Sequence, residues 1–430
     1  MEADAKPILT PKLRFPAFRD KPGWNEVTLT SVLTEHEEKN DGASEVHSVS
    51  VHKGVVNQVE HLGRSFAAAD RSNYNLAKPH DIIYTKSPTG DFPYGIVKQS
   101  LLPHNVIVSP LYGVFSPANR HLGYILDAYF ESPSRTSNYL APITQKGAKN
   151  TLQISNATFL SKGLYLPSDE AEQKKIAACL STLDERIGAE TQKLDAFKAH
   201  KKGLMQQLFP GKGETMPPLR FPEFRGEPGW TTKKLGEVAT PNTEKVGDKN
   251  CIPMSITSGI GLVSQLEKFG RIIAGSSYKN YLLLRKDDFA YNKSATKEYP
   301  EGFVALYSNE DLAAVPNSIF TCFRIKGDSP DPKYLNYLFL GNLHGLWLRK
   351  FIEVGARVHG SLSIDNDDLF ALPVPIPGGK SSIAEQQKIA ACLGALDNLI
   401  AAQGDIVKTL KAHKKGLMQQ LFPSSVEAEA

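Results

Sequence analysis

The chain repeats itself, and this repetition constrains its fold more than any other feature. Residues 198–210 read KAHKKGLMQQLFP, and residues 411–423 read the same thirteen letters at an offset of 213. EQKKIAACLSTLD from Glu172 recurs as EQQKIAACLGALD from Glu385, and LRFPAFRDKPGW from Leu13 recurs as LRFPEFRGEPGW from Leu219. Two tandem copies of one sequence predict two similar structural halves.

Between these anchors the halves diverge, but a sparse skeleton survives at an offset of 207. It comprises Gly54/Gly261, Gln58/Gln265, Glu60/Glu267, Gly63/Gly270, Arg64/Arg271, Asn73/Asn280, Tyr74/Tyr281, Asp81/Asp288, Tyr84/Tyr291, Lys86/Lys293 and Ser87/Ser294. One part of each half is therefore held fixed while the other part differs. This pattern predicts a shared frame that carries two different surfaces.

Two segments read as long helices. Each lacks internal proline and carries apolar residues in alternating steps of four and three, a spacing typical of a coiled coil when it is sustained over about four heptads. We expect Ser168 to cap the first helix and Ser382 with Glu385 to form a capping box on the second. The first seam is Ile176, Leu180, Leu183, Ile187, Leu194, Phe197, Leu204 and Leu208, with Glu190 and Lys201 in its polar slots; the second is Ile389, Leu393, Leu396, Ile400, Val407, Leu410, Leu417 and Leu421, with Gln403 and Lys414.

Each apolar seam needs a cover, and the closest equal partner is the other copy in the same chain. We expect the two helices, each about 40 residues and roughly 60 Å long, to pair antiparallel, since a long globular segment separates them. The alternative is that each helix packs only on its own domain. The short apolar stretches between turn residues, such as DIIYTKS and NVIVSPLYGVF, predict strands, with helices such as the one from Asp331.

The predicted fold class is α+β: two mixed α/β domains joined by two long helices in an antiparallel coiled coil, with an internal pseudo-twofold repeat. The predicted boundaries are a first domain over 1–166, a helix over 167–210, a linker over 211–218, a second domain over 219–378, a helix over 379–423 and a tail over 424–430. The linker, GKGETMPP, lets the second half start afresh.

The composition bounds the class of protein. With 41% hydrophobic and 22% charged residues, no leader-like start and no uninterrupted apolar run of about 18 residues, the chain is expected in the cytoplasm. The four cysteines show no metal-binding spacing, so we expect no metal site, and Cys179 and Cys392 are expected to be buried free thiols. A net charge of +4 is too small to argue for nucleic acid by itself.

Catalytic motifs are missing from the sequence. There is no Asn/Asp-Pro-Pro-aromatic motif of an amino-methyltransferase, no HExxH and no GxSxG. Gly379, Lys380 and Ser381 resemble the end of a phosphate-binding loop, but the required earlier glycine is Val374, so the stretch reads as a loop before a helix. The chain therefore reads as a binding protein with two globular heads on a rigid scaffold, which suits a linear repetitive polymer such as duplex DNA.

The ordered motifs resemble a known family, the specificity subunits of type I restriction-modification systems. The resemblance spans essentially the whole chain and rests on the paired PGW starts ending at Trp24 and Trp230, the D-x-x-Y-x-K-S segments, the proline exits at Pro167 and Pro377, the EQ-x-K-I-A helix starts and the KKGLMQQLFP ends. It implies a non-catalytic subunit with two target recognition domains, each reading half of a bipartite, asymmetric DNA site, while the paired helices fix the spacer.

The resemblance also implies partners and cofactors. Two methyltransferase subunits that methylate adenine and two motor-nuclease restriction subunits are expected to assemble with this chain on double-stranded DNA. S-adenosylmethionine, ATP and magnesium are expected on those partners, and no cofactor on this chain. A different class of protein remains open, namely a coiled-coil scaffold or adaptor with two protein-binding heads, whose binding would be insensitive to salt and to DNA sequence.

Candidate binding residues are the cationic and hydroxyl side chains of matched loops, because base reading and phosphate contact both need donors. The alternatives are a solvated loop for the lysines, an internal ion pair for the arginines and a solvated helix face for the His-Lys-Lys clusters. Tyr74, Tyr84, Tyr281 and Tyr291 are expected in strands or the core, and Trp24 and Trp230 as packing anchors. The DNA-binding candidates are Arg64, Lys86, Ser87, Thr89, Lys149, Asn150, Arg271, Lys293, Ser294, Thr296, Lys297 and Arg357; the partner-binding candidates are His200, Lys201, Lys202, His413, Lys414 and Lys415.

Overall fold

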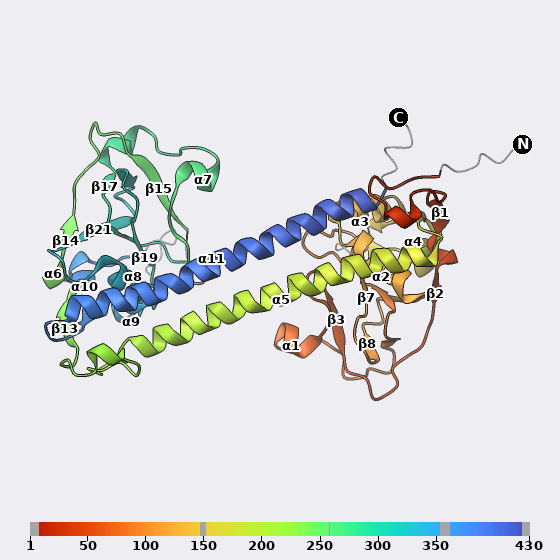
Figure 1. The fold of residues 1–430 in the computed structure, drawn as a ribbon, viewed down its shortest axis with the longest axis horizontal. Coiled ribbons are helices and arrows are strands. Elements are labelled where there is room, and N and C mark those ends of the chain that lie inside the picture. Colours follow the sequence, from red (N-terminus) through yellow and green to blue (C-terminus); the bar gives the residue numbers. More distant parts are fainter. Residues whose placement is uncertain (1–7, 147–151, 258, 353–361, 424–430) are drawn as a thin grey trace, which may run out of the picture. The chain divides into compact units, whose positions relative to one another are not determined.

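The computed structural model in Figure 1 describes residues 8–146, 152–257, 259–352 and 362–423. The chain divides into two compact units: unit 1 contains residues 1–191 and 405–430, and unit 2 contains residues 192–404. The two boundaries fall at Thr191 and Gly404, which are repeat equivalents. Each unit therefore holds one globular head, the start of one long helix and the end of the other.

The long helices are α5 (Glu170–Leu208) and α11 (Ser382–Leu421). Each ends two residues before a proline, Pro210 or Pro423, because proline lacks the N–H that would continue the helix. The predicted helices thus exist, with boundaries a few residues inside the predicted ones.

Head 1, residues 8–166, is built on an antiparallel sheet with strand order β2-β9-β6-β7, flanked by smaller strand pairs β3-β4, β5-β8, β10-β11 and β1-β12. Its strands are β1 (Asn25–Thr28), β2 (Leu33–Glu35), β3 (His47–Ser50), β4 (Gly54–Asn57), β5 (Asn75–Ala77), β6 (Ile82–Tyr84), β7 (Val97–Gln99), β8 (Val106–Val108), β9 (Gly113–Pro117), β10 (Gln145–Lys146), β11 (Leu152–Gln153) and β12 (Gly163–Leu166). Its helices are α1 (Gln58–Leu62), α2 (Arg120–Phe130), α3 (Pro133–Leu140) and α4 (Asn156–Ser161).

Head 2, residues 219–378, repeats this plan with an antiparallel sheet β14-β21-β18-β19, a sheet β16-β15-β20-β17 and the pair β13-β22. Its strands are β13 (Thr231–Lys234), β14 (Ala239–Asn242), β15 (Ile252–Thr257), β16 (Gly261–Ser264), β17 (Leu282–Leu284), β18 (Phe289–Asn292), β19 (Phe303–Leu306), β20 (Ala313–Val315), β21 (Phe320–Ile325) and β22 (Pro373–Ile376). Its helices are α6 (Leu235–Val238), α7 (Gln265–Phe269), α8 (Pro332–Leu340), α9 (Leu343–Leu348) and α10 (Asn366–Phe370). The predicted mixed α/β texture of both heads is confirmed.

The hydrophobic core of each unit is closed by both long helices. In unit 1, Trp24 lies in a core that includes residues from the start of α5 and from the end of α11. In unit 2, Trp230 lies in a core that includes residues from the start of α11, with the end of α5 packed against it. The residues from the helices and from the position just after each helix are Ile176, Leu180, Leu417, Met418, Leu421 and Phe422 in unit 1, and Ile389, Leu393, Leu204, Met205, Leu208 and Phe209 in unit 2. The apolar letters of the duplicated LMQQLF therefore make equivalent core contacts in the two units.

A buried ion pair fixes the entry of each head onto its helix. Arg14 forms two hydrogen bonds with Glu172, at 2.7 Å each, and Arg220 forms two with Glu385, at 2.8 and 2.7 Å. All four side chains are at most 5% exposed. The two-point geometry matches a guanidinium to a carboxylate, so it fixes orientation as well as distance.

The ends of the helices are held in the same way in both units. The backbone N–H of Leu13 donates to the carbonyl of Gln420 in unit 1, and that of Leu219 donates to Gln207 in unit 2. Gln207 and Gln420 are repeat equivalents, so the N-terminal segment of each head docks on the end of a long helix by the same backbone contact.

Two expectations about helix starts were wrong. The cap of α5 is Asp169, whose carboxylate accepts from the N–H groups of Ala171 and Glu172, rather than Ser168. Glu385 does not complete a capping box with Ser382; its carboxylate turns toward the head, where Arg220 and the Trp230 indole N–H bind it. A buried guanidinium attracts a carboxylate more strongly than a backbone N–H does.

The cysteine expectation was partly right. All four cysteines are free thiols, and Cys251 and Cys322 are buried. Cys179 and Cys392 are only half-buried, because their positions lie one step off the residues that face the cores. Helix α11 is long and apolar enough to cross a membrane by length and composition alone, but Ile389, Leu393 and Met418 are used in the protein cores.

Candidate nucleic-acid interface

The first candidate segment of head 1 is the turn between β6 and β7. Lys86 adopts a left-handed backbone conformation with φ of 51° and is half-buried, and burial lowers the pKa of its ammonium group against the opposing effect of Glu35. Ser87 and Thr89 are exposed. The backbone of Thr89 pairs with that of Phe92 at both N–H and carbonyl, which closes a tight turn. This turn presents two hydroxyl groups to solvent.

The matched turn of head 2 lies between β18 and β19. The ammonium group of Lys293 donates to the carbonyl of Ile364 at 3.2 Å, and burial lowers its pKa. The hydroxyl of Thr296 accepts from the Tyr299 N–H, while Lys297 is exposed. The N–H of Ser294 donates to the side chain of Asn292. Of the two lysines predicted here, Lys297 is the one directed to solvent.

The second pair of candidate segments lies mainly outside the described residues. Lys149, Asn150 and Arg357 all fall in the parts that the structure does not describe. In head 2, however, the described residue Leu362 donates its N–H to the carbonyl of Lys293 at 2.8 Å. Leu362 therefore lies directly against the start of the β18–β19 turn.

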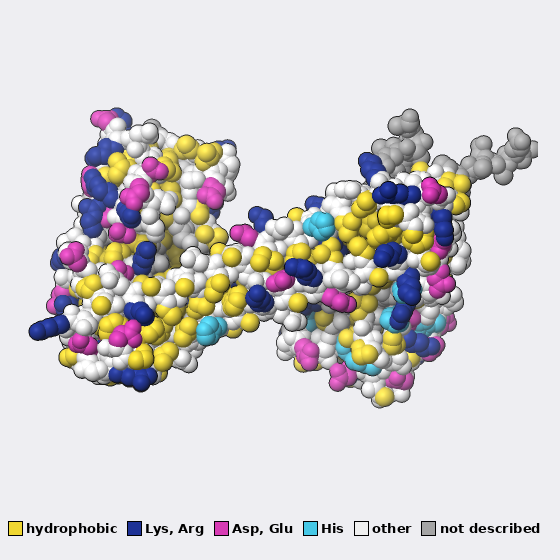
Figure 2. All heavy atoms as spheres, viewed as in Figure 1, with side chains coloured by type: hydrophobic (Ala, Val, Ile, Leu, Met, Phe, Trp, Pro, Cys, Tyr) yellow, Lys and Arg dark blue, Asp and Glu magenta, His cyan; other side chains and the backbone are white. Residues whose placement is uncertain are grey.

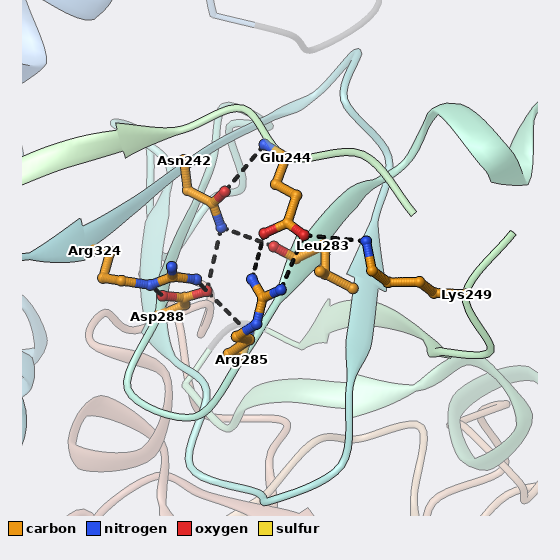
Figure 3. Close-up of polar contacts among 7 residues, drawn as sticks. All are labelled: Asn242, Glu244, Lys249, Leu283, Arg285, Asp288 and Arg324. Carbon is orange, nitrogen blue, oxygen red and sulfur yellow. Dashed lines mark hydrogen bonds and ion pairs between the residues drawn. The ribbon is translucent and has the colours of Figure 1, made fainter. Parts of the chain in front are cut away.

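The aspartate of the D-x-x-Y-x-K-S motif is a buried hub in both heads. Figure 3 shows Asp288, which is fully buried and accepts two hydrogen bonds from Arg324 at 2.6 Å each, one from the Arg285 N–H and one from Asn242. Beside this hub, Glu244 binds Arg285, and that guanidinium lowers the pKa of the Glu244 carboxyl to about 2. The hub holds the strands from which the β18–β19 turn emerges.

Head 1 builds the same hub with different partners. Asp81 accepts from the Lys78 N–H at 2.7 Å, from Ser116 at 2.8 Å, and is paired with His36 at 2.8 Å. The position is thus fixed while its neighbours differ between the heads. A carboxylate with several donors tolerates such exchange, because any N–H or O–H donor satisfies it.

The motif tyrosines are core residues, as predicted. The hydroxyl of Tyr84 donates to the carbonyl of Tyr94, and that of Tyr291 donates to Glu301, each at 2.7 Å. Both rings are fully buried, and burial raises the pKa of both phenols. Trp24 and Trp230 are likewise buried packing anchors. Most letters of this motif therefore support the turn rather than contact a ligand.

Arg64 and Arg271 follow two matched short helices. Helices α1 and α7 both end at a left-handed glycine, Gly63 with φ of 73° and Gly270 with φ of 67°. Both arginines are exposed, and the Arg64 guanidinium lies over the Phe66 ring at 4.5 Å. Both arginines therefore face solvent next to exposed apolar side chains, such as Phe66 beside Arg64.

The His-Lys-Lys clusters divide into inward and outward residues. In unit 1, Lys414 is buried and pairs with Asp184 at 2.6 Å and Glu131 at 2.5 Å. In unit 2, Lys201 pairs with Asp397 at 2.5 Å. These two lysines already have intramolecular partners, which leaves the exposed side chains His200, Lys202, His413 and Lys415 as the candidates for partner binding.

Sequence reasoning missed the residues that lock each head to its helix. Tyr124 donates its hydroxyl to Asp184 at 2.6 Å, and Tyr337 donates to Asp397 at 2.7 Å. The acceptors are repeat equivalents of one another, and so are the tyrosines. The sequence contained two signals for these contacts. Each tyrosine is followed by its aspartate after the same number of residues, and the repeated Leu-Arg-Phe-Pro contains Arg14 and Arg220.

Comparisons with known proteins give one family and one fold. Residues 34–199 match the model of the type I restriction modification DNA specificity domain. The search of curated protein sequences gave no match. The crystal structure of the type I restriction-modification system S subunit from M. genitalium is similar with a TM-score of 0.55 and 13% identity, over 97% of this chain and 100% of that one. At this identity the likeness concerns the fold alone.

Two further structures match with lower scores. One is a chain from a structure on complex assembly and conformational transition of the type I R-M system, with a TM-score of 0.48 and 17% identity over 94% of this chain and 98% of that one. The other is the HsdS subunit from Thermoanaerobacter tengcongensis, with 0.39 and 17% over 94% and 97%. The chain therefore matches the type I restriction modification DNA specificity domain over residues 34–199, and it shares the fold of the M. genitalium S subunit over nearly its whole length.

Proposed function

We propose that this chain is the non-catalytic DNA sequence-specificity subunit of a type I restriction-modification complex, in which each head reads one half of a bipartite, asymmetric DNA site. The main support for the proposal is that the two heads share the same supporting contacts beneath the β6–β7 and β18–β19 turns, while the turns themselves differ in charge. The buried aspartate hubs, the tyrosines beneath the turns and the helix locks are matched between the heads. At the turns, Ser87 and Thr89 match Ser294 and Thr296, but head 2 adds the exposed Lys297, where head 1 has Gly90.

The chemistry of the turns suits reading of base edges and phosphates. Lysine and arginine donate to guanine or to phosphate oxygens, and threonine and serine donate to either. Within the two turns, the exposed candidates are Ser87, Thr89, Thr296 and Lys297. Different donors on a common frame would read different half-sites with the same approach to the groove.

The two long helices would set the spacer between the half-sites as an antiparallel coiled coil. Support comes from two ion pairs, each inside one unit: Asp184 with Lys414, and Asp397 with Lys201. In an antiparallel helix pair with one register, the numbers of facing residues add up to a constant, and both pairs give the same sum. The 3.5-residue repeat of both seams agrees with such a pairing.

The catalytic work is assigned to partner subunits. Two methyltransferase subunits would bind S-adenosylmethionine and methylate an adenine in each half-site, and two restriction subunits would use ATP and magnesium. The complex would act on double-stranded DNA in the cytoplasm. The family match supports this division, since its model describes a DNA specificity domain.

Mapping methylated adenines by long-read sequencing, with this gene intact and deleted, tests the proposal. Loss of methylation at one gapped, bipartite motif on deletion is the expected result. An unchanged methylome, in cells where the cognate methyltransferase is expressed and active, would instead favour the scaffold with protein-binding heads. DNA affinity that falls steeply with salt would separate the two classes of protein in vitro.

A further inference from the structure

Each head carries a matched strand-helix-loop segment that lies outside the β6–β7 and β18–β19 turns in the sequence. We call residues 54–67 arm 1 and residues 261–274 arm 2. Arm 1 contains β4, α1 and the loop after it, and arm 2 contains β16, α7 and the corresponding loop. The arms are equivalent at the offset of 207, and much of the skeleton shared by the two heads falls within them. A feature kept in both heads is expected to serve something common to both, whereas half-site reading differs between them.

A glutamine clamp builds each arm in the same way. The side-chain oxygen of Gln58 accepts from the Phe66 N–H at 2.8 Å, and that of Gln265 accepts from the Ile273 N–H at 3.0 Å. The side-chain amides donate in turn to Ser48 and to the carbonyl of Met254. The loop after each helix is therefore held in one conformation by a side chain from the start of that helix.

The clamp presents apolar side chains to solvent at matched positions. In arm 1, Val59, Leu62 and Phe66 are 52%, 46% and 59% exposed, and their equivalents Leu266, Phe269 and Ile273 in arm 2 are 60%, 45% and 54% exposed. Two of the three positions are spaced three residues apart on a helix and so share one side. Figure 2 shows hydrophobic side chains at the surface over α7. An exposed apolar cluster built twice by hydrogen bonds marks an interaction surface.

Positive charges border these clusters. Arg64 and Arg271 follow the helices, and Lys268 lies over the Phe269 ring at 5.3 Å. In unit 2 the base of arm 2, at Gly261 and Leu262, also lines a groove of about 940 Å³ together with Lys198 and Lys202 from the end of α5. Lys198 and Lys202 belong to the segment that is duplicated letter for letter, and their equivalents Lys411 and Lys415 are exposed in unit 1.

We infer that arm 1 and arm 2 each dock one copy of the same protein partner, the methyltransferase subunit, through an apolar contact bordered by carboxylates of that partner. This inference rests on the proposed function. A protein partner fits better than DNA, because phosphate contacts need charged groups and amides rather than leucine, phenylalanine and isoleucine. A partner present in two copies explains why both the arms and the adjoining helix letters occur twice, and its carboxylates would complement the arginines and lysines.

Assembly of the full-length chain with its cognate methyltransferase subunit tests the inference. Three variants are compared with the wild-type chain: L62D/F66D in arm 1, F269D/I273D in arm 2, and all four substitutions together. L111D is the control, because Leu111 lies outside both arms and is 71% exposed. Native mass spectrometry counts the bound subunits, and titration gives the affinities. All substituted residues are exposed, so thermal unfolding should stay near the wild-type value.

The wild-type chain and L111D are expected to bind two methyltransferase subunits. Each single-arm variant should bind one subunit with unchanged affinity and the second at least about 10-fold more weakly, and the four-residue variant should lose both. The affinity of each free chain for its target duplex should not change.

Normal assembly of the arm variants would overturn the inference and leave the proposed function standing. Normal assembly with lost DNA affinity would overturn it too, and would assign the arms to the DNA interface. A wild-type chain that binds no methyltransferase would remove the proposed function and this inference together.

Discussion

The proposed spacing role of the helices can be tested by lengthening both of them at the positions where the chain passes from one unit to the other. The insertion sites follow Thr191 in α5 and Gly404 in α11, which are repeat equivalents at the unit boundaries. A direct repeat of residues 185–191 in α5 and of residues 398–404 in α11 adds one heptad to each helix. Each inserted heptad continues the apolar seam, because it repeats one seam isoleucine, Ile187 or Ile400, and one polar seam residue, Glu190 or Gln403.

One heptad should abolish methylation of the native motif. It adds about 10.5 Å at 1.5 Å per residue, which corresponds to about 3 base pairs, or roughly 100° of right-handed rotation of the groove. A left-handed coiled coil with a pitch of about 150 Å turns the heads by about 25° in the opposite sense. The second head then faces the DNA about 130° out of phase.

Three heptads should restore recognition at a longer spacer. They add about 31 Å and turn the heads by about 75° in the left-handed sense. Nine base pairs of DNA span almost the same length, and the groove rotates over them to about 50° short of a full turn. The angle between the rotation of the head and that of the groove therefore falls to about 25°. The expected product is a motif with the same half-sites and a spacer longer by about nine base pairs.

Long-read methylome mapping of cells that express each variant with the cognate methyltransferase measures both results. The control replaces residues 185–191 with the letters of residues 398–404 at unchanged length, and it should keep the native motif. Native methylation by the one-heptad variant at the wild-type level would refute the reasoning, as would a three-heptad variant that binds its partner but methylates no motif with a longer spacer.

Three further predictions concern single side chains. Arg220→Ala leaves the buried Glu385 carboxylate without its charged partner and should lower the free energy of unfolding by about 3–5 kcal/mol. Lys388→Ala breaks an exposed pair with Glu223 and should leave the free energy of unfolding nearly unchanged; equal losses in urea denaturation would contradict the assignment. Because Arg285 lowers the pKa of Glu244 from 4.5 to about 2, the stability contributed by this ionised carboxyl is present above pH 4.5 and is lost as the pH falls toward 2; the stability difference between wild type and E244Q should therefore shrink over that window, and a constant difference would rule this out. Lys297→Ala should weaken binding of the target duplex about 3- to 10-fold without a change in melting temperature. Lys293→Ala removes the hydrogen bond to the Ile364 carbonyl and should lower the free energy of unfolding by about 1–2 kcal/mol. Fluorescence anisotropy measures the DNA affinity of both variants, and thermal unfolding measures their stability.

Sequence reasoning predicted the elements well because their signals are local. The 3.5-residue spacing of apolar side chains is a property of the helix itself, so α5 and α11 were visible without a structure. The same holds for the strands of DIIYTKS and NVIVSPLYGVF, which became β6, β8 and β9. The break between α8 and α9 at Gly341 and Asn342 divided the helix that was expected from Asp331.

Individual polar residues were harder, because their partners come from distant parts of the chain. Lys414 was predicted to fill a polar slot of the seam and to bind a partner subunit, but Glu131 from head 1 and Asp184 from α5 pair with its ammonium group. Lys293 was predicted to contact DNA, but its ammonium group donates a hydrogen bond to the carbonyl of Ile364, 71 residues away in the sequence. Their sequence neighbours give no sign of either contact.

The sequence alone determined the duplication and the two long helices, since repetition and periodicity are properties of the residue order. Tertiary structure decided which of the predicted residues face solvent. Glu385 illustrates the difference: its position near a helix start predicts a cap, but Arg220, 165 residues earlier, draws the carboxylate into the core of unit 2. Charged groups are stabilised by whichever partner the fold brings within reach, and that choice is made in three dimensions.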